Sequence, residues 1–409
     1  KKGKLDEKYI NLSCRRILKA KFELGLFEND RIADKSLVKI NTPEHRNLAL
    51  KAAEESLVLL KNTGTLPLAD TKIASIAVVG PNADHPVAQN GDWSLGSKQM
   101  DKEHPRNCTV TVLDGIKARF TKGQVLYSKG AGIEPDEIED INAAIEVVKQ
   151  ADVTVAVLGD RDLYTGEVRS TGTLELMGQQ KELLERIIET KKPLIIVLIS
   201  SKPLVLPANA IQAADAIIAQ FNPGMLGGTA LAEVLFGDIS PSGKLTVSYP
   251  LHVGQLPLFY NVIRGQHGDH YADLTEQPLY SFGHGLNYGK IVYNTAKTDK
   301  STYSLKSDTE ITLTFSIRNY GSMEVDEIAQ VYLVDTITSV TWCVKELKAF
   351  SRVNLKPNET KDVIMKIKLS DLFIIDANGN KVVEPGNFEL HVGASSKDIK
   401  HKIKFAVTE

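Results

Sequence analysis

The sequence lacks the features that would suit it to a membrane, to nucleic acid or to a disulfide framework. Its longest apolar run, residues 193–199, is far shorter than the roughly 20 residues of a membrane-spanning helix. Lys and Arg number 49 against 51 Asp and Glu, so no positive surplus favours nucleic acid or an anionic membrane as a partner. The cysteines, Cys14, Cys108 and Cys343, are odd in number and far apart, which excludes a complete set of disulfides and a metal-type spacing.

The beginning of the chain lacks an initiator Met and an apolar signal core. Helical periodicity starts almost at once, with Ile10, Ile17 and Phe22 on one stripe. The segment therefore reads like the middle of a longer protein, and its apolar stripe is expected to pack against an earlier part. At 409 residues the chain also exceeds the roughly 250–300 residues that one core serves, so at least two domains are expected.

Residues 41–255 are typical of an α/β domain. Thr42 and Pro43 are an N-cap and a first helical residue, which predicts a helix there. Its apolar face is expected to consist of Leu48, Ala52, Leu57 and Leu60. Continuous apolar runs, typical of strands buried on both faces, cover residues 73–80, 153–159, 194–200 and 216–220. Amphipathic stretches at 140–150 and 178–190 are long enough to be crossover helices, so the pattern predicts a mostly parallel sheet.

The last part of the chain, residues 291–409, has the alternating pattern of an antiparallel β-sandwich. Residues 311–318 and 363–369 alternate apolar and polar side chains, with turn residues between such runs. Seven or so short strands in this length fit an immunoglobulin-like or fibronectin type III-like topology. Residues 256–290, rich in Gly, His, Tyr and Pro, are expected to form a connector over the surface.

Nine short stretches, in order along the chain, carry a resemblance to a known family. They are residues 16–27, 53–62, 66–68, 221–228, 235–238, 241–245, 278–286, 344–350 and 384–388. Each alone is a weak pattern of turn and core residues, but together they resemble the family 3 glycoside hydrolases of the β-glucosidase and β-xylosidase type.

The resemblance implies the C-terminal part of a retaining, exo-acting β-glycosidase. It assigns residues 1–40 to the segment that leaves a (β/α)₈ barrel, followed by the α/β sandwich, the connector and the fibronectin-like domain. The family's nucleophilic Asp lies in that barrel, which needs roughly 250 residues and is not found in this sequence. The barrel is accordingly expected as a partner, and a β-glucoside oligosaccharide or aryl glycoside as the substrate.

Glu167 is the expected general acid/base. It lies in a polar loop after the run 153–159, and ligands bind at the carboxyl ends of strands in open α/β sheets. Its spacing from Leu174, Leu176 and Gln180 matches the family's acid/base position. Related sequences often carry an Arg where this chain has Thr171, so the register of the loop could differ by a few residues.

Three other carboxyl groups remain alternatives for this role, namely Asp160, Asp162 and Glu175. Asp160 could instead hold loop amides, and Glu175 should face away from Leu174 and Leu176. In the assembled enzyme, a neighbouring carboxylate and partial desolvation are expected to raise the pKa of Glu167. Without the barrel, the loop is expected to be exposed and mobile.

Trp93, with Asp92 beside it, is the expected substrate-binding residue. It lies in a Gly-rich loop after the first strand of the α/β domain and resembles the family's aromatic platform for the leaving-group sugar. The alternative is a tryptophan packed in the core. For Trp342, a core position or a contact at the rim of the site is expected.

No metal or cofactor is expected. His267 and His270 with Asp269 superficially suggest a metal site, but a third firm ligand is missing nearby. Residues 80–83 lack the glycine spacing and the lysine of a phosphate-binding loop, which argues against a nucleotide-binding protein. A non-catalytic carbohydrate-binding or scaffold module remains the main alternative. The resemblance also implies a periplasmic or secreted location, and it leaves β-xylosidase specificity and homodimerisation open.

Overall fold

The computed structural model describes residues 3–28, 34–94, 108–265 and 271–409, and it divides the chain into two units, Lys1–Asn47 and Leu48–Glu409. The small unit contains helix α1 (Glu7–Glu23) and the short turn η1 (Lys35–Leu37). Asp6 caps α1 by accepting a hydrogen bond from the Lys8 amide at 3.0 Å. All residues of α1 are described, and none of them is buried, so its apolar stripe is exposed within this unit.

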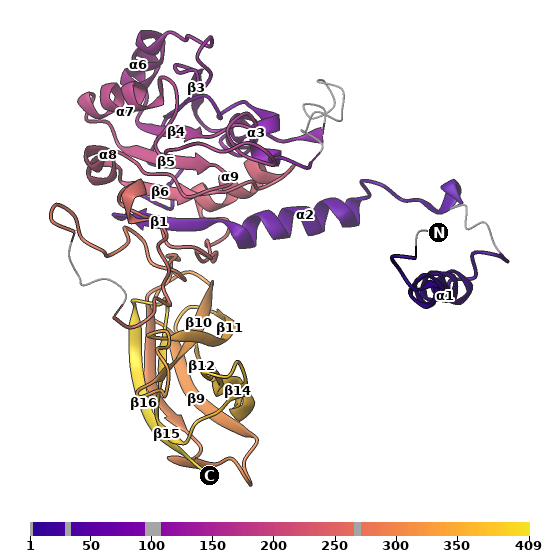
Figure 1. Cartoon of the computed structure of the whole chain (residues 1–409). Helices are drawn as coiled ribbons and strands as arrows, with labels where there is room; N and C mark the ends of the chain where they lie inside the picture. The colour runs from indigo at the N-terminus through magenta and orange to yellow at the C-terminus, as the bar shows by residue number, and fades with distance from the viewer. Residues whose placement is uncertain (1–2, 29–33, 95–107, 266–270) are drawn as a thin grey trace. The chain divides into compact units, whose positions relative to one another are not determined.

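A six-stranded sheet forms the centre of the first domain of the large unit (Figure 1). Its strands are β1 (Val58–Asn62), β2 (Ser75–Val79), β3 (Gln124–Ser128), β4 (Val153–Gly159), β5 (Leu194–Ile199) and β6 (Ala216–Ala219). The spatial order is β1-β6-β5-β4-β2-β3. Strands β6, β5, β4, β2 and β3 run parallel to one another, and β1 pairs antiparallel to β6. The predicted α/β fold with a mostly parallel sheet is therefore confirmed.

The predicted C-terminal end of the first helix is wrong. Helix α2 (Pro43–Ser56) begins at the expected proline, but it stops before Leu57, and strand β1 follows. Leu57 and Leu60 are both at most 2% exposed, whereas Leu48 is 69% exposed. Four consecutive buried apolar residues at 57–60 suit a strand covered on both faces better than one stripe of a helix.

Helices cover both faces of the sheet. They are α3 (Pro86–Asn90), α5 (Val112–Arg119), α6 (Ile141–Gln150), α7 (Gln180–Glu189), α8 (Ala208–Ala213) and α9 (Gly227–Phe236), with the short η2 (Val253–Gln255) after them. Helices α6, α7 and α8 share one core with alternate residues of the strands, and α2, α3, α5 and α9 share the other. Neighbours on β5 thus belong to opposite cores: Ile196 lies in the first and Val197 in the second. Because side chains alternate along a strand, one thin sheet separates two apolar layers.

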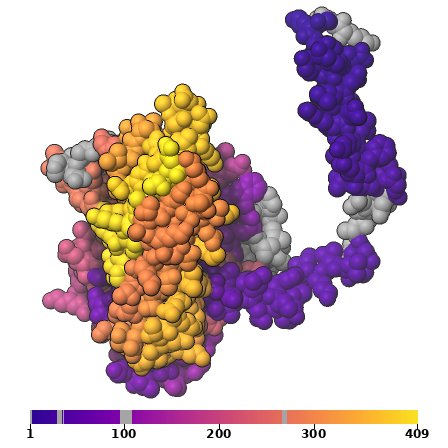
Figure 2. Space-filling view, turned by 90° about the horizontal axis from the view of Figure 1, so that it is seen from below, coloured from indigo at the N-terminus to yellow at the C-terminus, as the bar shows by residue number. Residues whose placement is uncertain are grey.

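The second domain of the large unit is a β-sandwich, as predicted. Its elements are β7 (Ile291–Thr298), β8 (Thr302–Ser304), β9 (Glu310–Asn319), β10 (Val325–Asp335), β11 (Glu346–Leu355), β12 (Thr360–Lys368), η3 (Leu369–Leu372), β13 (Ile374–Ile375), β14 (Lys381–Val382), β15 (Gly386–Gly393) and β16 (Ile399–Thr408). The two sheets of the sandwich have the orders β11-β10-β15-β16-β8 and β12-β9-β7, and β13 pairs with β14 in a separate two-stranded sheet. The pairs within the two sheets of the sandwich are antiparallel except β16–β8. The orange and yellow parts of the chain lie against each other in Figure 2.

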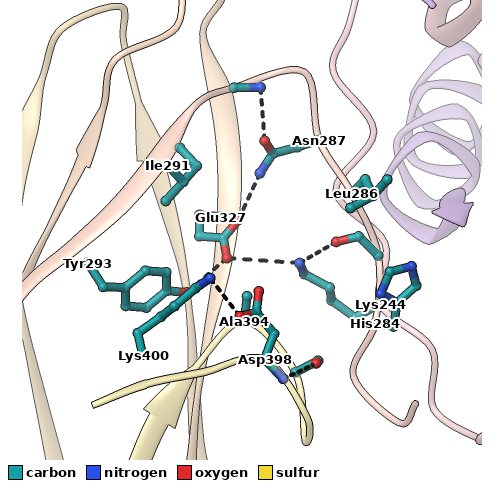
Figure 3. A pocket seen from close by; sticks show the side chains of 13 residues that line it. Lys244, His284, Leu286, Asn287, Ile291, Tyr293, Glu327, Ala394, Asp398 and Lys400 are labelled. Carbon is teal, nitrogen blue, oxygen red and sulfur yellow. Dashed lines mark hydrogen bonds and ion pairs between the residues drawn. The ribbon is translucent and has the colours of Figure 1, made fainter. Parts of the chain in front are cut away.

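A buried carboxylate joins the two domains. Glu327 on β10 is 3% exposed and lines a cavity of about 200 Å³ at the junction. Tyr293 Oη and Asn287 Nδ2 each donate to its carboxylate at 2.8 Å, and Lys244 Nζ lies 3.9 Å from Oε1 (Figure 3). Since Lys244 and Asn287 precede the sandwich and Tyr293 belongs to it, this group, the Glu327 cluster, spans the boundary between the two domains.

A pair of carboxyl groups makes the stability of the first domain depend on pH. Burial, together with a hydrogen bond to Glu54 of α2, raises the pKa of Glu233 on α9 from 4.5 to about 7. The folded state then holds a proton that the unfolded chain releases, so stability falls as pH rises from about 4.5 to about 7. Because Glu233 is partly exposed, we expect Glu233→Gln to stabilise the chain at pH 8 by about 1–2 kcal/mol and by little at pH 4.

Thermal unfolding at the two pH values checks this expectation. Glu146→Gln is the matched control, because Glu146 is exposed and pairs with Lys149 on the surface of α6. If Glu233→Gln stabilised the chain equally at pH 4 and pH 8, the raised pKa of Glu233 would be contradicted.

None of the helices in the described part of the chain is both long and apolar enough to cross a membrane. Cys14, Cys108 and Cys343 are all described, and none of them forms a disulfide.

Candidate active site

The candidate site lies in the loops that follow the parallel strands. The polar loop that contains Glu167 begins directly after β4, and the loop that contains Trp93 follows β2 and the short helix α3. Parallel strands end at the same edge of a sheet, so their loops come together there. The structure brings these two loops into direct contact.

Glu167 sits at the tip of a tight turn. The Arg169 amide donates to the Gly166 carbonyl at 3.2 Å and closes the turn around Glu167 and Val168. Gly166 has φ 122° and Val168 has φ 57°, a conformation that is unusual for a β-branched residue. The Glu167 side chain is exposed, as expected for this chain without a barrel. It is therefore presented outward at the sheet edge.

Asp92 holds this turn from the neighbouring loop. Its Oδ2 accepts a hydrogen bond from the Glu167 amide at 3.0 Å. Its Oδ1 lies 3.8 Å from Arg169 Nη1, and the same guanidinium nitrogen lies 3.6 Å from Asp162 Oδ2. The Asp92 side chain is only 13% exposed, so protein groups cover most of it. The sequence places Asp92 near a sugar, but nothing in it connects the residue to Glu167, 75 positions away.

Trp93 is not in the core. The residue is 69% exposed, and its φ of 56° places its backbone in the left-handed region immediately after Asp92. The Ser94 hydroxyl donates to the Gly91 carbonyl at 2.7 Å and closes this part of the loop. An exposed indole, on the residue that follows the one in contact with the Glu167 turn, has the surface needed to stack on a sugar or an aromatic ring.

Asp160 is an unsuitable alternative to Glu167, because its carboxylate is buried and engaged. The side chain is 1% exposed, and Oδ2 lies 3.1 Å from Lys202 Nζ and accepts from Ser200 Oγ at 3.3 Å. Its carboxylate therefore contacts two side chains, in place of the loop amides that its position suggests. Lys202 Nζ also donates to Thr171 Oγ1 at 2.6 Å. A cation thus stands beside Thr171, where the family resemblance leads us to expect an Arg.

The two other alternative carboxylates differ in their surroundings. Asp162 is half-buried and pairs with Arg169, so it supports the same turn as Asp92. Glu175 is exposed, and the backbone there bridges to Val205. Leu176 is buried, which agrees with the expected opposite directions of these neighbours.

A group of charged residues lies at the start of the Glu167 loop. Arg161 is 7% exposed, and its Nη1 lies 3.0 Å from Glu137, which also accepts from Lys129. Burial alone would raise the pKa of Glu137, but hydrogen bonds from Lys129 and the Ile133 amide and the charge of Arg161 hold it at about 2. The Glu137 carboxylate therefore stays ionised at every pH at which the site could work.

His85 caps the short helix that precedes the second loop. Burial, followed by the charge of Arg161, lowers the pKa of His85 to about 4. The imidazole is neutral near pH 7, and its Nδ1 accepts from the Ala88 amide at 3.0 Å. It thereby caps helix α3, which ends at Asn90, just before Asp92.

Within the residues that the structure describes, no group of three or more His, Cys, Asp and Glu side chains could hold a metal ion. His267, Asp269 and His270 lie outside the described residues.

Two family models match the chain. The glycosyl hydrolase family 3 C-terminal domain matches residues 57–288, and the fibronectin type III-like domain matches residues 327–396. Among curated proteins, a beta-xylosidase from Formosa agariphila is 39% identical over 400 residues, covering 95% of this chain and 54% of that protein. The periplasmic beta-glucosidase of Salmonella typhimurium is 34% identical over 438 residues, covering 98% and 56%.

Solved structures agree with these matches. A β-glucosidase involved in saponin metabolism from intestinal bacteria superposes with a TM-score of 0.92 at 39% identity, over 99% of this chain and 60% of that one. A β-glucosidase from Listeria innocua in complex with isofagomine gives 0.87 at 30% identity, over 99% and 56%. The chain spans about half the length of the curated relatives it matches. It belongs to glycosyl hydrolase family 3, and it carries that family's C-terminal domain followed by a fibronectin type III-like domain.

Proposed function

We propose that this chain supplies the general acid/base, Glu167, of a retaining β-glycosidase that removes non-reducing terminal β-D-glucosyl residues. The observation that carries the proposal is an exposed carboxyl group on a turn that Asp92 holds at the strand-end edge, with the exposed Trp93 directly after Asp92 in sequence. Trp93 would bind the leaving group and Asp92 would lie at the same site. Membership of family 3 and the relatives' names support glycoside hydrolysis.

The proposed reaction needs a second carboxyl group that comes from outside the described site. In retaining hydrolysis the two carboxyl groups lie about 5–5.5 Å apart. A nucleophilic Asp on the (β/α)₈ barrel would attack the anomeric carbon while Glu167 gives its proton to the departing oxygen. Glu167, now ionised, would then take a proton from water as that water attacks the glycosyl-enzyme. The sugar leaves with its original configuration, and both carboxyl groups return to their starting states.

The barrel is the proposed partner of this chain. The chain spans about half of its curated relatives, and the exposed apolar residues of α1, among them Ile10, Ile17 and Phe22, would suit packing against such a domain. In the complete enzyme the second carboxylate and the loss of solvent would raise the pKa of Glu167 so that it can act as an acid. We further propose a periplasmic or secreted location, supported by the periplasmic relative.

A non-catalytic carbohydrate-binding module is the second candidate. It is motivated by Thr171, which stands where related sequences often have an Arg. The contact of Lys202 with Thr171 Oγ1 weakens this motive, since it restores a positive charge at the same place. We therefore favour the catalytic role.

The stereochemistry of the product tests the proposal. With the barrel-containing enzyme and an aryl β-glucoside, proton NMR should show β-glucose first, followed by slow mutarotation to the α-anomer. The aryl β-xyloside, measured in parallel, decides between the glucosidase and β-xylosidase alternatives. Early formation of the α-anomer would overturn the retaining mechanism, and no turnover of either glycoside would support the binding module.

A further inference from the structure

We propose that Asp92 is a positioning residue that fixes the direction of the Glu167 carboxyl group, in place of a residue that binds sugar itself. The inference deepens the proposed function and rests on it. Asp92 belongs to the loop after α3, whereas Glu167 belongs to the loop after β4. A single carboxylate therefore connects two loops that are 75 positions apart in sequence.

The first contact acts on the backbone of Glu167. Asp92 Oδ2 accepts from the Glu167 amide at 3.0 Å, a charge-assisted hydrogen bond. It fixes the peptide from which the Glu167 side chain departs, but it leaves that side chain exposed. A general acid must point at the oxygen it protonates, and a displacement of about 1 Å can cost roughly 100-fold in rate.

The second contact is the close packing of the carboxylate against Gly166. A Cβ built on Gly166 would lie 2.2 Å from Asp92 Oδ2, and the φ of 122° also disfavours other residues. The turn and the carboxylate thus fit together only because this position has no side chain. Such a fit is consistent with a fixed relation between the two loops.

The third contact is electrostatic. Arg169 Nη1 lies between Asp92 Oδ1, at 3.8 Å, and Asp162 Oδ2, at 3.6 Å, and Arg169 also donates to the Asp162 carbonyl. Both ends of the turn around Glu167 are therefore attached: the Glu167 amide to Asp92, and the Arg169 side chain to Asp92 and Asp162. Trp93 follows Asp92 directly, so the same tether relates the exposed indole to the carboxyl group.

Two substitutions separate the contributions. Asp92→Ala removes every contact of the carboxylate. Asp92→Asn keeps an oxygen that can accept from the Glu167 amide but loses the attraction to Arg169. If Asp92 positions the general acid, the loss should be larger for alanine than for asparagine.

The leaving group provides a readout that separates positioning from general damage. Phenyl β-glucoside needs protonation of its leaving oxygen, whereas 2,4-dinitrophenyl β-glucoside departs without it. In the barrel-containing enzyme we expect Asp92→Ala to lower kcat/KM for the phenyl glucoside about 100-fold and for the dinitrophenyl glucoside less than about 5-fold. Asp92→Asn should show the same selectivity with a loss of about 10-fold or less for the phenyl glucoside.

Asp152 provides a matched control variant. Its carboxylate accepts from the Ala74 and Ser75 amides at 2.7 and 2.9 Å, and it lies just before β4, at the opposite end of that strand. Asp152→Asn thus weakens a similar carboxylate–amide anchor away from the site. It should change both kcat/KM values by the same small factor.

Hydrogen exchange of this chain alone gives a second readout. A peptide that contains Glu167 should exchange faster in Asp92→Ala than in the wild type, with Asp92→Asn between them. Equal losses on both glucosides, or unchanged exchange, would overturn the positioning role. Glu167→Ala serves as the reference: if it lacks the leaving-group selectivity, the proposed function fails, and if it shows the selectivity while Asp92→Ala does not, only the present inference fails.

Discussion

Replacing Glu167 with alanine is expected to reduce the rate of aryl β-glucoside hydrolysis by the barrel-containing enzyme by about 10²–10⁴-fold. The loss arises because the variant can neither protonate a poor leaving oxygen nor activate water against the glycosyl-enzyme. With an activated aryl glucoside the first step survives, so the intermediate should accumulate. Azide needs no general base, and it should restore turnover and yield β-glucosyl azide, which mass spectrometry and NMR identify.

Glu175→Ala is the variant that discriminates between carboxylates. Glu175 lies in the same loop and is also exposed, so it shares the solvent environment of Glu167 without the Asp92 contact. We expect its rates to stay near those of the wild type and to be insensitive to azide. Rescue by azide in this variant, or wild-type rates in Glu167→Ala, would remove Glu167 from the mechanism.

Replacing Glu327 with alanine is expected to destabilise the sandwich domain by about 3–5 kcal/mol. The carboxylate is 3% exposed and receives hydrogen bonds from Tyr293 and Asn287, with Lys244 close by (Figure 3). Its removal leaves these groups without their acceptor in the junction, and the uncompensated Lys244 charge adds to the cost. The Glu327 cluster spans both domains, so their unfolding should also become less cooperative.

Tryptophan fluorescence can follow this effect, because the sequence has only Trp93 and Trp342. In a Trp93→Phe background, Trp342 reports on the sandwich during urea unfolding. Glu310→Ala is the matched control, since Glu310 pairs with Lys366 at 2.6 Å on the surface of the same domain. It should cost at most about 1 kcal/mol. A similar small cost for Glu327→Ala would show that the cluster does not hold the domains together.

The sequence was sufficient to predict those strands in which nearly every residue is buried. Strands β4 and β5 are apolar at nearly every position because helices cover both faces, and a short, continuous apolar run of this kind is typical of such strands. Strand β1 was missed because 57–60 continues an apolar helical stripe and its true partner, β6, lies more than 150 positions away. Strand β3 was not predicted, because its burial is mixed and its ends are polar.

Residues of the candidate site could be proposed from the sequence, but their connections could not. Glu167 and Trp93 follow from loop positions and from the family's motifs. The contact between Asp92 and Glu167 depends on how two loops meet at the sheet edge, and no local pattern encodes that meeting. The same holds for Lys202, a residue after β5 that brings a positive charge to Thr171.

Side chains of strand β5 belong alternately to two apolar layers, and this has a consequence for how the protein can evolve. Ile196 and Val197 are joined by a peptide bond, yet they touch different sets of partners. Energetic coupling follows shared contacts, so a substitution of Ile196 should couple more strongly to residues of its own layer than to those packed around Val197. Ile196 shares its layer with Ala156 and Leu184, although Ala156 lies far away along the chain and Leu184 belongs to another element. Mutational drift could therefore remodel one side of the sheet while the other keeps its shape.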